Sequence, residues 1–149
     1  MAGIGIMMVE GGRLESKETQ SSREEMGHRV RTANDVLDMV FLQDLVAGDL
    51  DLLREIITLY LSGLPQRMSQ IKEAVAAGQA RDLERAAHGL KGASGNFQAR
   101  HVIEAARRLE AMGHQGDLAW AGETLNILEK EVERVRSFLT RVLEAPLVP

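Results

Sequence analysis

The chain has 149 residues and a formal net charge of −4, and it contains no cysteine. This length suits one domain with a tail, and the mild charge gives no electrostatic basis for binding nucleic acid or an anionic membrane. The absence of cysteine excludes disulfides, thiolate nucleophiles and cysteine-ligated metals. Because aromatic residues make up only 3% of the sequence, the core must be aliphatic, which favours packing between helices.

The first 31 residues differ in composition from the rest. An apolar start from Met1 to Val9 has no basic leader and is too short to span a bilayer. A polar run from Glu15 to Glu25 follows, without apolar partners at helical spacing. We interpret residues 1–31 as a flexible tail or linker, and we expect a cytoplasmic protein without membrane insertion.

Five amphipathic helices are predicted after this tail. Thr32 or Asn34 caps the first, which ends at Gly48. Its apolar positions are Val36, Leu37, Val40, Leu42 and Leu45.

Asp49 is the predicted cap of a longer second helix that ends at Gly78. Pro65 lies inside the apolar stripe of this helix and predicts a bend or a break, because proline lacks the backbone donor. Tyr60 in this helix and Trp120 further along the chain lie among apolar residues at helical spacing. We expect both of these aromatic side chains in the core.

The third helix is predicted from about Arg81 to Gly95, and the fourth ends at Gly113 or Gly116. The fifth begins with Asp117 as its cap and ends before Pro146. No segment alternates at period two. The fold class is therefore all-α: an antiparallel four-helix bundle with a short leading N-terminal helix, spanning residues 32–145, with residues 146–149 as a C-terminal tail.

One histidine occupies the exposed face of the predicted third helix. The apolar stripe of that helix consists of Leu83, Ala86, Ala87, Leu90 and Ser94. At about 100° of rotation per residue, His88 falls almost opposite this stripe and points to solvent. Gly89 and Gly92 each cost up to about 1 kcal/mol against alanine inside a helix. We infer that they leave bare backbone where another protein approaches His88.

The residues around His88 suit a carrier better than an enzyme. A solvated imidazole can attack phosphorus, and Lys91, one turn along, can balance the charge of a transferred phosphoryl group. Arg81 and Arg85 extend this charge as a basic rim. The sequence offers no glycine-rich phosphate loop, no acidic triplet for Mg²⁺ and no Ser-His-Asp grouping. A partner must therefore supply the catalyst.

The stretch His-Gly-Leu-Lys-Gly-Ala-Ser-Gly-Asn-Phe, from His88 to Phe97, resembles the His-x-Leu-Lys-Gly-Ser/Ala signature of histidine-containing phosphotransfer (HPt) domains of two-component phosphorelays. The resemblance covers roughly residues 33–143. It implies that His88 is the phosphoacceptor, that Lys91 stabilises the phosphoryl group and that Gly92 keeps the approach open. Glu110 stands where family members often have a Gln or Glu that hydrogen-bonds the imidazole Nδ1 and leaves Nε2 to attack.

This resemblance also implies partners and a reaction. The chain would accept a phosphoryl group from an aspartyl phosphate on a response-regulator receiver domain and pass it to another receiver. A hybrid sensor histidine kinase is an alternative or additional partner. The protein would be a monomeric phosphocarrier with no kinase activity and no cofactor of its own, because the receiver domain supplies Mg²⁺.

Two departures from the family pattern concern Gln98 and Arg107. Gln98 stands where the family usually has glycine, so we expect Gly95 and Asn96 to supply any left-handed backbone in this loop. Arg107 stands where chemotaxis kinases have a histidine, which favours the hybrid-kinase or stand-alone type of relay domain.

Two other functions remain as alternatives. One is an adaptor bundle that binds receiver or kinase domains through the same face without transferring anything. The other is a metal-binding or enzymatic bundle, which would need ligands from His88, His101 and His114. These histidines lie on different helices or loops and lack the i, i+4 pairing of zinc helices, so we expect no metal site.

Overall fold

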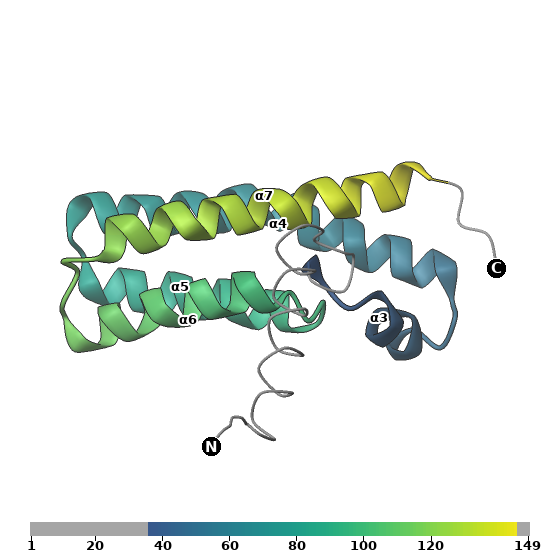
Figure 1. Ribbon diagram of the computed structural model, residues 1–149, viewed down its shortest axis with the longest axis horizontal. Coiled ribbons are helices and arrows are strands. Elements are labelled where there is room, and N and C mark those ends of the chain that lie inside the picture. The colour runs from purple at the N-terminus through teal and green to yellow at the C-terminus, as the bar shows by residue number, and fades with distance from the viewer. Residues whose placement is uncertain (1–35, 146–149) are drawn as a thin grey trace, which may run out of the picture. The chain divides into compact units, whose positions relative to one another are not determined.

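The structure is a computed structural model and describes residues 36–145. Over this range the regular elements are all α-helices (Figure 1), as the sequence predicts. The helices are α3 (Met39–Leu45), α4 (Leu50–Ala77), α5 (Ala80–Gly95), α6 (Arg100–Gln115) and α7 (Ala121–Glu144). No helix in the described range is long and apolar enough to traverse a membrane. The predicted tails at 1–31 and 146–149 and the predicted caps Thr32 and Asn34 lie outside the described residues.

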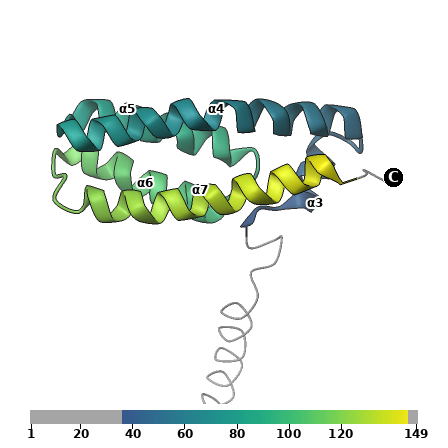
Figure 2. The ribbon, with the colours of Figure 1, turned by 90° about the horizontal axis from the view of Figure 1, so that it is seen from above.

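The four long helices pack side by side around one aliphatic core. α4 contacts α5 and α7, and α6 contacts the same two helices, while the short α3 contacts α4 (Figures 1 and 2). The largest fully buried side chains come from all five helices and the connections before α3 and α6: Leu37, Leu42, Leu53, Ile57, Leu64, Ile71, Leu83, Leu90, Phe97, Leu109 and Leu128. This core fixes the rotation of α5 about its axis, and with it the direction of His88.

The predicted limits of α4 are confirmed. The side chain of Asp49 accepts a hydrogen bond from the Leu52 amide at 3.0 Å, and Gly78 ends the helix with a left-handed φ of 67°. Of the predicted bend or break at Pro65, the break is wrong, because α4 runs through that residue. Leu64 and Met68, on either side of it, are buried in the core. Their packing holds the helix continuous in spite of the missing donor.

The first and last helices begin later than predicted. α3 starts at Met39, and its cap is Asp38, whose carboxylate accepts from the Phe41 amide at 2.9 Å. Of its predicted apolar positions Val40 and Leu45 are mostly exposed, since a helix of seven residues buries only one narrow face.

The expected cap of the last helix is also wrong. α7 starts at Ala121, whereas Asp117 accepts a hydrogen bond from the Ala119 amide at 3.2 Å in the preceding turn. This extra turn carries Trp120 out of the core, and 63% of its surface is exposed. Tyr60, in contrast, is buried as predicted.

The loop between α5 and α6 turns at Gln98 itself. Gln98 has a φ of 51°, whereas Asn96 has a φ of −63° and Gly95 lies inside α5, so the expectation for Gly95 and Asn96 is wrong. Phe97 is buried, and its ring centroid lies 4.4 Å from that of Tyr60. Because Phe97 anchors the loop in the core, the chain must reverse direction at the next residue, whatever its side chain.

We expect Gln98→Gly to raise the free energy of unfolding by about 0.5–1 kcal/mol. Glycine removes the left-handed strain of about 1–2 kcal/mol, although its greater freedom in the unfolded chain offsets part of the gain. Urea denaturation measures the change. Gln98→Ala is the control: it shortens the side chain but keeps the strain, so its stability should stay near that of wild type. Equal stability of both variants would contradict the assignment of strain to this residue.

Candidate functional site

His88 projects from the solvent-facing side of α5. Leu83, Ala87, Leu90 and Ser94 point into the core from the opposite side of the helix. The His88 side chain is 69% exposed, as its position opposite the apolar stripe predicts. A protein partner therefore has access to the ring without any rearrangement of the helices.

Glu110 on α6 connects two predicted site residues of α5. Its Oε2 lies 2.8 Å from His88 Nδ1, and its Oε1 lies 2.7 Å from Lys91 Nζ. The hydrogen bond from Lys91 is the main cause that lowers the pKa of the Glu110 carboxyl below its ordinary value, and the bond with His88 adds to it, while partial burial opposes both. Glu110 is therefore ionised at neutral pH.

The ionised carboxylate determines which imidazole nitrogen is available. A carboxylate accepts hydrogen bonds and cannot donate them, so Nδ1 of His88 must carry the proton in this contact. In a neutral ring, Nε2 then holds the lone pair. The structure thus brings together His88, Lys91 and Glu110 in a geometry that suits nucleophilic attack from Nε2.

The two glycines near His88 differ in what surrounds them. A Cβ at Gly92 would meet nothing within 4 Å, so its backbone is open as expected. A Cβ at Gly89 would lie 3.1 Å from Nη1 of Arg67, a half-buried residue of α4. The bare backbone at Gly89 is therefore covered by a guanidinium group and does not provide room for a partner. No sequence signal marks Arg67, because only the pairing of α4 with α5 brings it there.

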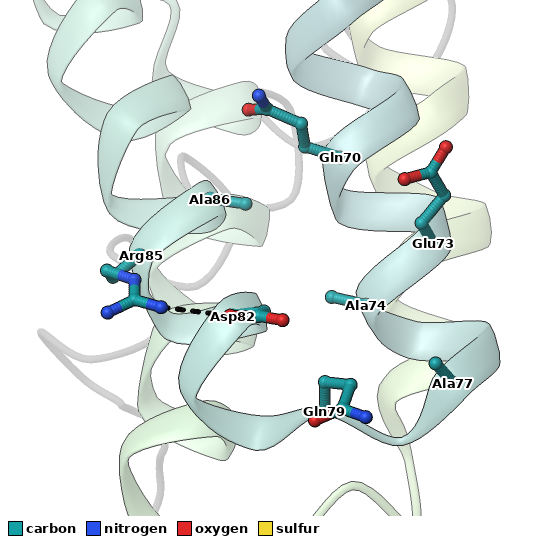
Figure 3. Close-up of a pocket in the computed structure, with 8 residues that line it drawn as sticks. All are labelled: Gln70, Glu73, Ala74, Ala77, Gln79, Asp82, Arg85 and Ala86. Carbon is teal, nitrogen blue, oxygen red and sulfur yellow. Dashed lines mark hydrogen bonds and ion pairs between the residues drawn. The ribbon is translucent and has the colours of Figure 1, made fainter.

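The predicted basic rim is placed differently from the other site residues. Arg85 pairs with Asp82 at 2.9 Å, at the edge of a pocket between α4 and α5 that Gln70 and Glu73 also line (Figure 3). Arg81 is exposed on the first turn of α5. The ion pair with Asp82 directs Arg85 to this pocket, so a role for these two arginines at His88 stays a prediction.

A second histidine–glutamate pair joins the same two helices. Nδ1 of His114 on α6 lies 3.0 Å from Oε2 of Glu84 on α5. Between Glu110 and His114, α6 approaches α5 so closely that a Cβ at Gly113 would lie 2.6 Å from both the Ala80 carbonyl oxygen and the Glu84 nitrogen. This close approach brings the Glu110 side chain within reach of His88. In the described part of the chain, no three His, Asp or Glu side chains come together as a metal-binding group.

Comparisons with known proteins agree on one family. A family model described as "Hpt domain" matches residues 55–138. The crystal structure of histidine-containing phosphotransfer protein B (HptB) from Pseudomonas aeruginosa PAO1 is similar, with a TM-score of 0.70 and 25% sequence identity over 76% of this chain and 97% of that chain.

The crystal structure of the HPT domain from the Hpt sensor hybrid histidine kinase from Shewanella shares the fold, with a TM-score of 0.66 and 18% identity over 76% of this chain and 98% of that chain. Among curated protein sequences there is no match. The resemblance that the residues around His88 indicate is confirmed: the chain belongs to the Hpt domain family of histidine-containing phosphotransfer modules.

Proposed function

We propose that the chain is a phosphorelay intermediate that accepts a phosphoryl group on His88 from a receiver-domain aspartyl phosphate and passes it to another receiver. Membership of the Hpt family supports a phosphotransfer role in two-component signalling. The observation that carries the specific step is the contact of His88 Nδ1 with Glu110, 2.8 Å long, on a ring that is open to solvent. It leaves Nε2 as the nucleophile.

In this reaction the chain supplies the nucleophile and the charged groups next to it, and the receiver supplies the phosphoryl group. The Nε2 lone pair attacks phosphorus, an N–P bond forms, and the P–O bond to the aspartyl oxygen breaks and releases the receiver carboxylate. The Nδ1 proton stays in its bond to Glu110, which stabilises the charge that develops on the ring. Lys91 faces the growing charge on the phosphoryl oxygens. The reverse steps deliver the group to a second receiver.

The same proposal covers the source of Mg²⁺, the partners and the arrangement of the helices. In this proposal the receiver brings the Mg²⁺ and the chain has no cofactor of its own. The chain acts as a monomeric cytoplasmic phosphocarrier without kinase activity, and its partners are response-regulator receivers, a hybrid sensor kinase, or both. We take its helices to form an antiparallel four-helix bundle with α3 as the short leading helix, a form that presents His88 on one outer wall.

Transfer from a phosphorylated receiver domain tests this function. The purified full chain is mixed with a receiver that carries a radiolabelled aspartyl phosphate, and the label is followed by gel electrophoresis. We expect the label to move to this chain in a bond that is labile in acid and stable in base, as a phosphoramidate is. Binding of receivers without movement of label from any of them would instead indicate the adaptor function.

We expect Glu110→Ala to slow this transfer about 10- to 100-fold, the range for losing a group that orients a reacting imidazole. Glu110→Gln should retain most of the rate, because its amide oxygen can still accept from Nδ1–H. The initial rate of label transfer measures both variants. Glu84→Ala removes the corresponding carboxylate of the other pair and should leave the rate unchanged. A similar loss in Glu84→Ala and Glu110→Ala would contradict a specific role for Glu110.

A further inference from the structure

Arg67 has an unusual environment for a half-buried cation. Its guanidinium lies across two glycines, with Nη1 3.1 Å from the position of a Cβ on Gly89 and Nε 3.8 Å from that of a Cβ on Gly63. A side chain at Gly89 would crowd it, whereas one at Gly63 would make an ordinary van der Waals contact, so Gly89 is the glycine that leaves space for this arginine between α4 and α5. The glycine backbone next to the Arg67 guanidinium offers it no carboxylate to bind.

The neighbouring charges around His88 are paired, whereas that of Arg67 is not. Lys91 is bound to Glu110 at 2.7 Å, Arg85 to Asp82 at 2.9 Å and Arg107 to Glu104 at 2.7 Å. Arg67 has no hydrogen bond or ion pair with any residue in the range 36–145. A partly desolvated guanidinium without acceptors is costly, and its planar donors match phosphoryl oxygens well. This environment therefore favours an anion.

The register of α4 against α5 places Arg67 beside Gly89, the residue after His88. The Tyr60 hydroxyl on α4 hydrogen-bonds Ser94 Oγ on α5 at 2.7 Å in the core. The two helices run in opposite directions (Figure 2). Arg67 follows Tyr60 by seven residues on α4, so it lies beside a part of α5 that precedes Ser94. Its approach to Gly89 marks this level. Glu110 reaches His88 from α6, whereas Arg67 comes from α4 and lies against Gly89, the residue next to His88.

We propose that Arg67 is a phosphoryl-binding residue, a second cation that donates hydrogen bonds to the oxygens of the phosphoryl group on His88. This inference rests on the proposed function and extends it. The charges explain why a second cation is needed. Lys91 and Glu110 cancel one another, and a phosphoryl dianion on a ring that keeps its Nδ1 proton leaves one negative charge in excess. Arg67 supplies the charge that balances it.

Chemical phosphorylation tests Arg67 without any receiver. The full-length wild-type chain and Arg67→Gln are phosphorylated with potassium phosphoramidate, and the phosphohistidine signal is titrated by ³¹P NMR. A nearby guanidinium opposes protonation of the phosphohistidine, so we expect Arg67→Gln to raise the pKa at which its signal titrates by about 0.5–1 unit, a 3- to 10-fold change in its proton affinity. Arg67→Lys keeps the positive charge and should shift the titration less. Circular dichroism checks that the variants are folded.

Arg107→Gln is the matched control, because Arg107 lies one turn before Glu110 on α6 but is paired with Glu104 at 2.7 Å. Its titration should coincide with that of wild type. Identical titrations of wild type and Arg67→Gln would overturn the role of Arg67 and leave the relay function intact. Failure of receivers to phosphorylate wild type, with a normal Arg67 effect on the chemically phosphorylated protein, would overturn the relay and retain the phosphoryl-binding site.

Discussion

Replacing His88 with glutamine should abolish phosphoryl transfer to the chain and leave its free energy of unfolding within about 0.5 kcal/mol of wild type. The effect on transfer is complete because no other group of this site offers a nucleophile with an oriented lone pair. The effect on stability is small because the side chain is 69% exposed and its polar contact is the bond to Glu110, which an amide can also make. Label transfer and urea denaturation measure the two quantities.

His114→Gln is the matched control for this experiment. His114 is as exposed as His88, pairs with a glutamate in the same way and lies between the same two helices. Its replacement should leave transfer at the wild-type rate. Equal labelling of wild type and His88→Gln would rule out His88 as the acceptor. Loss of label in both variants would show that the pairs act on the fold and not on the chemistry.

Local sequence signals predict the helices and the exposure of His88 because both depend on neighbours along the chain. Apolar spacing gives the rotation of α5, and Asp49, Gly78 and Gly116 mark helix limits through capping and left-handed backbone. The signature around His88 indicates the family for the same reason: its residues lie within a few turns of one helix. Glu110 is placed in the site by resemblance, and the contact at 2.8 Å is visible only in the structure.

The features that the sequence does not predict depend on how one helix lies against another. Arg67 is an ordinary helical arginine until the register of α4 against α5 brings it over Gly89. Trp120 lies at apolar spacing, but an additional turn before α7 rotates it to solvent. Gln98 takes a left-handed backbone because Phe97 is fixed in the core, which no propensity of glutamine indicates.

Gly113 is the clearest case of a residue whose role appears only in the packing. Its sequence context suggests the end of a helix, but α6 continues to Gln115 and ends at Gly116. Gly113 is buried, and a Cβ there would lie 2.6 Å from the Ala80 carbonyl oxygen and from the Glu84 nitrogen. Both are backbone atoms of α5, so neither can rotate away. Any side chain at this position must push the two helices apart.

We therefore expect Gly113→Ala to lower the free energy of unfolding by about 3 kcal/mol, at the upper end of the cost of overpacking a core, although alanine is the better helix former. Gly92→Ala is the matched control, since a Cβ there meets nothing within 4 Å and should stabilise the helix by up to about 1 kcal/mol. Urea denaturation compares the two. Because Glu110 lies one turn before Gly113, the separation of α5 and α6 should also slow phosphoryl transfer in the protein that remains folded. A Gly113→Ala variant as stable as Gly92→Ala would show that the helices do not approach this closely in solution.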